Sequence, residues 1–208
     1  MLRIYGRKNS SNVQKVLWCC DELGLVFERI DMGREFGGNR EAPYLALNPN
    51  GLVPTLVEED GFVLWESNAI LRYLARTRGP AGFWPQQARE AAIADQWMDW
   101  QTNSLNVAFT PIFHGLVRQG PHERDAAAIE RSREATQRHL AMLDRHLQRS
   151  AWVAGDAFGV ADIPLGIYAY RWYAFEGIAR DSLPALEDWY RRLRERAAFR
   201  ERVMVGLA

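Results

Sequence analysis

The sequence predicts an α/β first half, ordered β-α-β and then β-β-α, followed by an all-helical second half. Three observations support this prediction. Before residue 78, short apolar runs alternate with segments of helical periodicity, and an Asp-Gly pair separates two of those runs. After the Gly- and Pro-rich residues 78–82, only long helical periodicity remains, and most of the tryptophans lie there.

The N-terminal segment is typical of a β-α-β unit. Residues 2–5 alternate weakly before a glycine, which favours a short strand. Polar residues 9–12 indicate a helix start, and Gly24 is a stop signal for that helix. Residues 27–31 form the second strand, parallel to the first because a helix connects them. The apolar positions of the helix are Val13, Val16, Leu17, Cys20 and Leu23.

After the second strand, the sequence predicts a loop, then a β-hairpin and then a helix. Residues 32–50 contain several glycines and prolines and little periodicity, which predicts a loop with one helical turn. The runs 55–58 and 62–65 flank an Asp-Gly pair, a hairpin signature. Helical periodicity then returns over residues 67–76, where Ile70 belongs to the apolar stripe.

The second half is predicted to contain helices only. Their expected ranges are 88–118, bent near Pro111, then 122–150, 161–175, 184–196 and a short piece near Phe199. The sequence therefore divides into a first domain at residues 1–78, a linker at 79–87 and a helical domain at 88–208.

Composition excludes several classes of function. Hydrophobic residues make up 48% and charged residues 25% of the 208, which is ordinary for a globular protein. Lys+Arg and Asp+Glu both number 26, so no basic excess indicates a nucleic-acid partner. No apolar run approaches the roughly 18 residues of a membrane helix, and the N-terminus lacks a secretory h-region. The only cysteines are the neighbours Cys19 and Cys20, so we expect a reduced, cytoplasmic protein.

Two short segments about ten residues apart suit a small zwitterionic ligand. The first, Val-Pro-Thr-Leu at residues 53–56, predicts a turn that enters a strand. The second, Glu-Ser-Asn-Ala-Ile at residues 66–70, predicts a helix that begins with an acid and a hydroxyl. An acid can pair with an ammonium, and a helix start can bind a carboxylate. Glutathione carries both groups.

The whole chain resembles the soluble glutathione transferase family, and in particular its serine-type, theta-, phi- or zeta-like bacterial members. That family joins a thioredoxin-like domain to an all-helical domain. The segments that carry the resemblance are Ser10-Ser11-Asn12, residues 48–56, Glu66-Ser67-x-Ala69-Ile70, and Gly155-Asp156-x-Phe158-x-x-Ala161-Asp162. In the last of these, Gly159 replaces the usual Ser or Thr of a capping box, so we expect a folding element rather than a chemical one.

The resemblance implies where glutathione lies. The proline before the third strand is cis in thioredoxin-like folds, so Pro54 is expected to present the backbone of Val53 to the cysteinyl part. Glu66 and Ser67 are expected to bind the γ-glutamyl end at a helix N-terminus. Leu52 replaces the Gln or Lys with which many relatives contact the glycyl end. The candidates to replace that contact are Asn50, Lys8 and Arg7.

One hydroxyl at the start of the first helix suffices to activate the glutathione thiol. Lowering a thiol pKa from about 8.5 to about 6.5 requires about 2.7 kcal/mol. A hydrogen bond to a charged group contributes about 1.5–3 kcal/mol. By resemblance, Ser10 is the catalytic serine, Ser11 and Asn12 are the alternatives, and simple helix capping is a further interpretation. Tyr5 occupies the place of the tyrosine-type phenol, but the Arg-Gly-Arg-like stretch of those classes is missing.

The second substrate is expected between the domains, where aromatic residues of the helical half are available. Asp99, in a run of aromatic residues, is expected by resemblance either to reach the partner subunit's glutathione or to be an ordinary helix-face acid. The candidate residues for this second-substrate site are Phe109, Phe113, His114, Trp172 and Tyr173.

The resemblance implies a cytoplasmic, homodimeric glutathione transferase with a role in detoxification. It would stabilise the glutathione thiolate and add it to a small electrophile, with glutathione as co-substrate and no metal. Two alternatives remain open. The doubled serine favours another glutathione-dependent reaction, such as isomerisation, dehalogenation or disulfide reduction. The second alternative is a non-catalytic binding module of the same fold.

Overall fold

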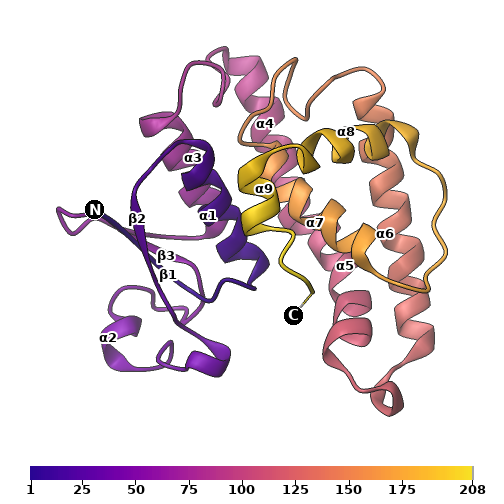
Figure 1. Cartoon of the computed structure of the whole chain (residues 1–208), viewed down its shortest axis with the longest axis horizontal. Helices are drawn as coiled ribbons and strands as arrows, with labels where there is room; N and C mark the ends of the chain where they lie inside the picture. Colours follow the sequence, from indigo (N-terminus) through magenta and orange to yellow (C-terminus); the bar gives the residue numbers. More distant parts are fainter. Residues whose placement is uncertain (208) are drawn as a thin grey trace.

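The computed structural model describes residues 1–207 and confirms the predicted order of a mixed sheet followed by helices (Figure 1). The sheet has the strand order β2-β1-β3-β4. β1 pairs with β2 in parallel, with Leu2 opposite Phe27, while β3 is antiparallel to both β1 and β4. The strands are β1 (Leu2–Tyr5), β2 (Phe27–Ile30), β3 (Thr55–Val57) and β4 (Val63–Trp65).

Two long helices of the first half pack against each other beside this sheet. They are α1 (Ser11–Glu22) and α3 (Ser67–Arg78), the second of which extends two residues beyond the predicted end. The loop between β2 and β3 contains two short turns rather than one. These are a 3-10 turn at Arg34–Phe36 and the short helix α2 (Ala42–Leu45). In Figure 1 the strands lie between α2 on one side and α1 and α3 on the other.

The predicted helical stretch over residues 88–118 is continuous, but it has π-helical turns in it. Such turns at Gln101–Leu105 and His114–Arg118 follow α4 (Ala88–Trp100) and α5 (Asn106–Phe113). Pro111 lies inside α5. π-Helical turns are often found at functional sites.

The predicted helix at residues 122–150 is shorter than expected. α6 spans Ala126–Leu147, because Asp125 caps it by accepting a hydrogen bond of 2.9 Å from the backbone N–H of Ala128. A separate 3-10 turn precedes the cap. The remaining helices are α7 (Asp162–Ala174), α8 (Pro184–Arg194) and α9 (Ala197–Arg202).

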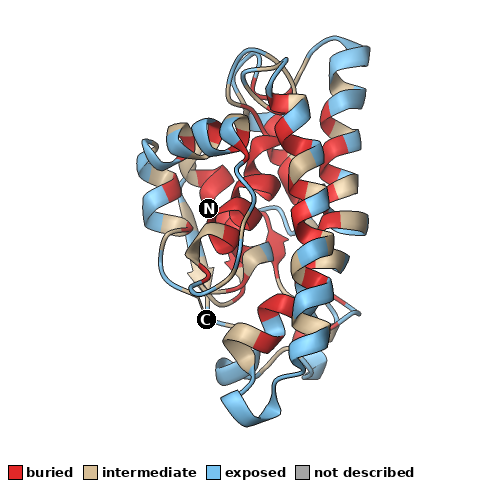
Figure 2. Cartoon of the chain, turned by 90° about the vertical axis from the view of Figure 1, so that its right-hand side faces the viewer, coloured by how far each residue is buried: buried red, intermediate tan, exposed pale blue. Residues whose placement is uncertain are grey.

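α7 forms the centre of the molecule and joins its two halves. Every residue from Asp162 to Trp172 is buried, and Figure 2 shows the buried residues gathered between the outer helices. The helices meet closely at Gly166, where an added Cβ would lie 2.9 Å from both Leu193 Cδ1 and Trp18 Cη2. Trp18 belongs to α1, so the close approach fixes α1 against the helical half.

The structure confirms that residues 155–162 act as a folding element, as the sequence predicts. The buried Asp162 carboxylate accepts hydrogen bonds from the N–H groups of Val153 (3.0 Å) and Gly159 (2.9 Å) and from Trp189 Nε1 (2.8 Å). Burial raises the pKa of Asp162 to about 6, against these three hydrogen bonds. The carboxylate therefore ties the start of α7 to the preceding loop and to α8.

The two cysteines are buried in α1 and are unpaired. Burial raises the pKa of both thiols, that of Cys20 to about 12. Because the thiolate is the reactive form, neither side chain is a nucleophile near neutral pH. Among residues 1–207, no helix combines the length and the apolar character that crossing a bilayer requires.

Candidate active site

A small pocket of about 40 Å³ lies at the peptide bond between Val53 and Pro54, which is cis as predicted. We call it the proline pocket. The loop before Pro54 is held by Tyr44 and Asn48, which donate hydrogen bonds of 2.6 and 2.9 Å to the carbonyl of Leu52. The lining residues are Asn12, Asn48, Asn50, Leu52, Val53, Pro54, Glu66 and Ser67.

The backbone of Val53 is unpaired in this pocket. Among the described residues, neither its N–H nor its C=O makes a hydrogen bond. The N–H and C=O of one residue point the same way from an extended strand, as antiparallel pairing requires. Polar backbone groups are normally satisfied in folded proteins, so Val53 is prepared to pair with an extended ligand.

The start of α3 closes the other side of the proline pocket. Glu66 has a positive φ of 71°, a conformation that non-glycine residues seldom adopt and that is often retained at functional sites. Ser67 is buried, and its hydroxyl donates to Asn12 Oδ1 at 3.2 Å. The pocket thus combines a helix N-terminus, a hydroxyl and an acid within one small space.

Lys15 is a buried cation behind this pocket, and the sequence analysis did not single it out. It is only 2% exposed, and its ammonium donates to Gln101 Oε1 (2.8 Å), Asn68 Oδ1 (3.3 Å) and Ser67 Oγ (3.4 Å). Burial lowers the pKa of Lys15 to about 7, opposed by Glu66. Helical periodicity predicts that a lysine lies on a solvent-facing stripe. This rule fails for Lys15 because all residues from 13 to 20 are buried, so α1 has no such stripe there.

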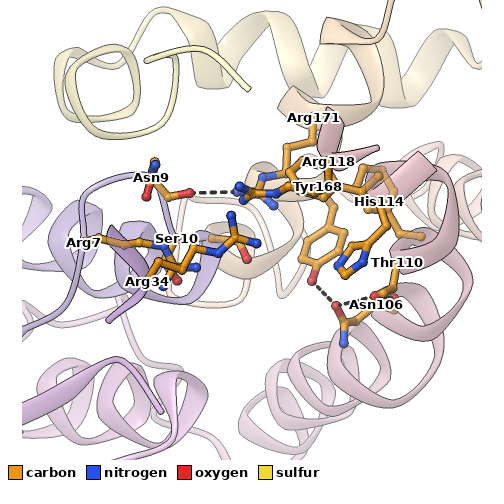
Figure 3. Close-up of a pocket in the computed structure, with 13 residues that line it drawn as sticks. Arg7, Asn9, Ser10, Arg34, Asn106, Thr110, His114, Arg118, Tyr168 and Arg171 are labelled. Carbon is orange, nitrogen blue, oxygen red and sulfur yellow. Dashed lines mark hydrogen bonds between the residues drawn. The ribbon is translucent and has the colours of Figure 1, made fainter. Parts of the chain in front are cut away.

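A second pocket of about 160 Å³ lies at the start of α1, between the two halves of the chain. We call it the arginine pocket, after Arg7, Arg34, Arg118 and Arg171. Figure 3 shows Arg7, Ser10 and Arg34 on one side of it and His114 and Tyr168 on the other. The remaining lining residues are Asn9, Ser11, Asn106, Phe109, Thr110 and Phe113.

The first residues of α1 face different pockets. Ser10 is the N-cap residue of the helix, is 8% exposed, and makes no capping hydrogen bond with its hydroxyl. Ser10 and Ser11 line the arginine pocket, whereas Asn12 lines the proline pocket and is bound by Ser67. Ser10 therefore occupies the predicted capping position of α1, but its hydroxyl makes no capping hydrogen bond and lines the arginine pocket.

The arginine pocket contains three of the five residues predicted for the second substrate. Phe109, Phe113 and His114 line it, but Trp172 and Tyr173 do not. Trp172 is 1% exposed in the core, and Tyr173 stacks on Tyr190 with a centroid distance of 4.9 Å.

The residues of α7 that reach the arginine pocket are Tyr168 and Arg171 instead. They are three apart and share a face of the helix, while Tyr173 points to the opposite side. Trp172, four residues after Tyr168, lies at the edge of that face and is buried in the core instead. Helical spacing alone predicts which residues share a face. It does not predict which face meets the cavity.

Two other residues singled out in the sequence lie outside both pockets. Tyr5 packs against Tyr44 at a ring-centroid distance of 5.9 Å and lines neither pocket. Asp99 is exposed and accepts a hydrogen bond of 2.5 Å from Arg72, which also binds Asp95.

The guanidinium groups of the arginine pocket repel one another. Burial and Arg34 lower the pKa of Arg7, and burial, Arg34 and Arg7 lower that of Arg118. Burial lowers the pKa of Arg171 to about 10, and Arg118 and Arg7 contribute to the shift. The acid that opposes these shifts is Glu35, which raises the pKa of Arg7 and Arg118.

Known proteins resemble the chain along its whole length. Residues 9–77 match the family described as Glutathione S-transferase, N-terminal domain, and residues 102–197 match Glutathione S-transferase, C-terminal domain. Glutathione S-transferase GstB of Escherichia coli K12 is 44% identical over 209 residues, which cover 100% of both chains. The disulfide-bond oxidoreductase YfcG of the same organism is 32% identical over 85% of this chain and 82% of that one.

A solved structure agrees closely with this fold. The theta class glutathione S-transferase from the citrus canker pathogen Xanthomonas axonopodis pv. citri, with glutathione bound, superposes with a TM-score of 0.95. It is 44% identical, and the match covers 100% of this chain and 99% of that one. Glutathione transferase F7 from Populus trichocarpa, at 27% identity, gives a TM-score of 0.86 over 100% of both chains.

Proposed function

The chain belongs to the glutathione S-transferase family, and we propose that it binds glutathione at the proline pocket and transfers its thiol to an electrophile in the arginine pocket. As a member of this family, the protein is a transferase. In this proposal residues 1–78 bind glutathione, residues 79–87 are a linker, and residues 88–208 contribute to the second-substrate site. Ala208 lies outside the described residues.

The γ-glutamyl end of glutathione is proposed to enter the proline pocket. Its carboxylate would replace Asn12 Oδ1 as the acceptor of the Ser67 hydroxyl, and it would accept further hydrogen bonds from the N-terminal N–H groups of α3, at the positive end of the helix dipole. Its ammonium would pair with Glu66. A pocket of about 40 Å³ suits one end group of the tripeptide, so the rest must lie along the cis proline.

The cysteinyl part is proposed to pair with the free N–H and C=O of Val53. The two pockets meet at the start of α1, where Asn12 lines the proline pocket and the neighbouring Ser11 lines the arginine pocket. A ligand bound at Ser67 and paired with Val53 would therefore extend toward the start of α1. For the glycyl end, Asn50 and Arg7 remain the proposed contacts, since Leu52 offers no polar side chain.

The Ser10 hydroxyl is the proposed partner of the thiolate. The observation that carries the proposal is its position: it sits at the N-cap of α1, makes no capping bond, and faces the cavity between the two halves. One hydrogen bond of about 1.5–3 kcal/mol matches the roughly 2.7 kcal/mol that lowering the thiol pKa by two units requires. Ser11 is the alternative donor, and Asn12 is less favoured because it lines the proline pocket and not the arginine pocket.

Titration of enzyme-bound glutathione tests this assignment. We expect the wild-type protein to bind glutathione in calorimetry and to conjugate an aromatic halide. Ser10→Ala should raise the pKa of the bound thiol by about two units and lower kcat/KM about a hundredfold. Ser11→Ala is the matched control. A larger loss in Ser11→Ala than in Ser10→Ala would move the role to Ser11.

Disulfide reduction is a second candidate reaction, because the 32% identical relative YfcG is a disulfide-bond oxidoreductase. Such a reaction here would depend on glutathione thiols alone, since both cysteines are buried and protonated. A panel of disulfides and aryl halides distinguishes the two activities. Reduction that exceeds conjugation would make the disulfide reaction the principal one.

We also propose a cytoplasmic homodimer that takes part in detoxification, on the grounds of the family resemblance. Light scattering of the purified protein measures the oligomeric state. A monomer at micromolar concentration would contradict the dimer.

A further inference from the structure

The arginine pocket is built for negative charge. Two of its four guanidinium groups come from the first half of the chain: Arg7 follows β1, and Arg34 begins the 3-10 turn at Arg34–Phe36. The other two come from the helical half: Arg118 ends the π-helical turn after α5, and Arg171 belongs to α7. All four converge on one cavity of about 160 Å³ (Figure 3). Bringing like charges together in a partly buried space is unfavourable unless an anion compensates them.

Among the described residues, Glu35 opposes the charge of Arg7 and Arg118 from a distance, but three of the four arginines have no carboxylate in contact. In the described part of the chain, Arg7, Arg34 and Arg171 form no ion pair with a carboxylate. Arg171 donates to the backbone carbonyl of Asn9 at 3.3 Å, which uses only one of its N–H groups. The Nε of Arg7 is buried without a hydrogen-bond partner. Unsatisfied buried donors of this kind call for a ligand.

The same cavity also has an apolar wall. Phe109 and Phe113 stack with a centroid distance of 6.2 Å, and the Arg171 guanidinium lies 4.5 Å from the centre of the Phe113 ring. The stacking orients Arg171 while leaving its edge available for a carboxylate. A ligand that combines an aromatic ring with a carboxylate would match the phenylalanine wall and the guanidinium groups together.

We propose that the electrophile taken by this enzyme is itself an anion: a small arene or alkyl halide that carries a carboxylate, bound by the arginine pocket while glutathione attacks. The proposal rests on the proposed function, because it assigns the second substrate of that reaction. The γ-glutamyl carboxylate of glutathione is assigned to the proline pocket, and its glycyl carboxylate to Asn50 and Arg7. The cations proposed for the electrophile are therefore those that line the rest of the cavity, with Arg34 and Arg171 among them.

The probe reaction is conjugation of 4-(bromomethyl)benzoate. The thiolate sulfur forms a bond to the benzylic carbon while the carbon–bromine bond breaks, and bromide leaves with the bonding electron pair. The thiol proton passes to solvent before attack. No oxidant or reductant takes part, and the carboxylate stays unchanged, so it serves only as a handle for the arginines.

The matched substrate is 4-(bromomethyl)benzamide, which has the same leaving group and nearly the same shape but no charge. After subtraction of the spontaneous reaction, we expect kcat/KM to favour the benzoate at least about tenfold. Arg34→Gln should reduce this preference severalfold, mainly by raising KM, because an anchoring contact is made equally in ground and transition states. Arg138→Gln, on the exposed face of α6, is the matched control and should leave the preference unchanged.

Equal turnover of the two substrates would overturn the anion proposal while leaving the glutathione transferase activity in place. A second measurement decides the case without turnover: calorimetry with the two conjugates, S-(4-carboxybenzyl)glutathione and S-(4-carbamoylbenzyl)glutathione. Both carry the same glutathione, so a difference reports only on the second substrate. At least about tenfold tighter binding of the carboxylate supports the proposal, and equal affinity overturns it. Failure to bind glutathione itself would contradict the proposed function instead.

Discussion

The proline pocket and the arginine pocket meet at the start of α1, yet they offer different chemistry to a ligand. The proline pocket presents backbone groups, a hydroxyl and one acid, with a buried lysine behind them. The arginine pocket presents four cations together with the rings of Phe109, Phe113 and Tyr168. The difference matches the two substrates that we propose. A zwitterion is bound by fixed polar groups of both signs, whereas a simple anion is bound by an excess of positive charge.

The difference also separates two kinds of recognition. Backbone groups at Val53 do not change when side chains are substituted, so they can recognise the same peptide in many related sequences. The arginines are side chains from separate segments, so single substitutions can alter the second substrate without disturbing the first. Substitutions at each pocket, and at the scaffold that both share, therefore test the comparison.

Asp162→Ala should have the largest effect, and it should damage both pockets together. It leaves the N–H groups of Val153, Gly159 and Trp189 without their buried acceptor, at a cost of about 3–5 kcal/mol in the free energy of unfolding. Chemical denaturation measures this loss. A stable variant with one pocket intact and the other lost would show that the pockets do not depend on a common scaffold.

Ser67→Ala should affect the proline pocket alone. Losing one hydrogen bond to a charged carboxylate costs about 2 kcal/mol, which corresponds to a roughly thirtyfold weaker affinity for glutathione. Calorimetry measures the affinity, and Ser182→Ala, at an exposed position, is the control. The preference for a carboxylate-bearing electrophile should stay the same. A change in that preference would mean that the two pockets are coupled.

Lys15 links stability to pH behind the proline pocket. Because its pKa is about 7 in the folded protein and about 10.4 in an unfolded chain, the unfolded state binds more protons between these values. The contribution of Lys15 to the free energy of unfolding should therefore rise by about 1–2 kcal/mol from pH 7 to pH 8.5, and this contribution should level off below pH 7.

Denaturation of wild type and Lys15→Met over this pH range measures the contribution. The variant should lose the rise in stability. The range ends at pH 8.5 because the buried thiols Cys19 and Cys20 oppose the trend above it: their raised pKa values make the folded state bind more protons there. An equal rise in the variant would assign the pH dependence to another group.

Salt should produce the smallest effect, and only at the arginine pocket. Raising the ionic strength from about 0.05 M to about 0.5 M shortens the Debye length severalfold and should raise KM for the benzoate about threefold. KM for glutathione should change less, because its recognition depends mainly on hydrogen bonds. Steady-state kinetics at fixed pH measures both values. A stronger salt effect on glutathione than on the benzoate would reverse the assignment of the two pockets.

Much of the proline pocket was predictable because its residues come from short, recognisable segments. The cis peptide before β3, the helix that begins at Ser67 and the helix start at residues 10–12 were all expected, and the structure brings them together. The structure also shows that the three consecutive residues at that start divide between the pockets. This division depends on the direction of each side chain from the helix.

Several residues of the arginine pocket were predicted, but the gathering of its four arginines was missed for a physical reason. Arg7, Arg34, Arg118 and Arg171 lie far apart in the chain and belong to no local pattern. Trp172 and Tyr173 were predicted at the second-substrate site because they are aromatic. However, α7 is buried on every side, so an aromatic side chain there does not indicate a ligand. The sequence predicts the helical spacing of α7 correctly, but it does not predict which side of α7 faces the cavity.

The sequence by itself determined the order of strands and helices, the turn at Pro54 and the helix start at Ser67, because these features follow from the conformational preferences of neighbouring residues. The tertiary structure decided which cations share a cavity, which face of α7 meets it and where Lys15 is buried. Those results depend on close packing between distant segments, as at Gly166, where α7 meets Trp18 of α1 and Leu193 of α8. Local sequence carries no direct record of that packing.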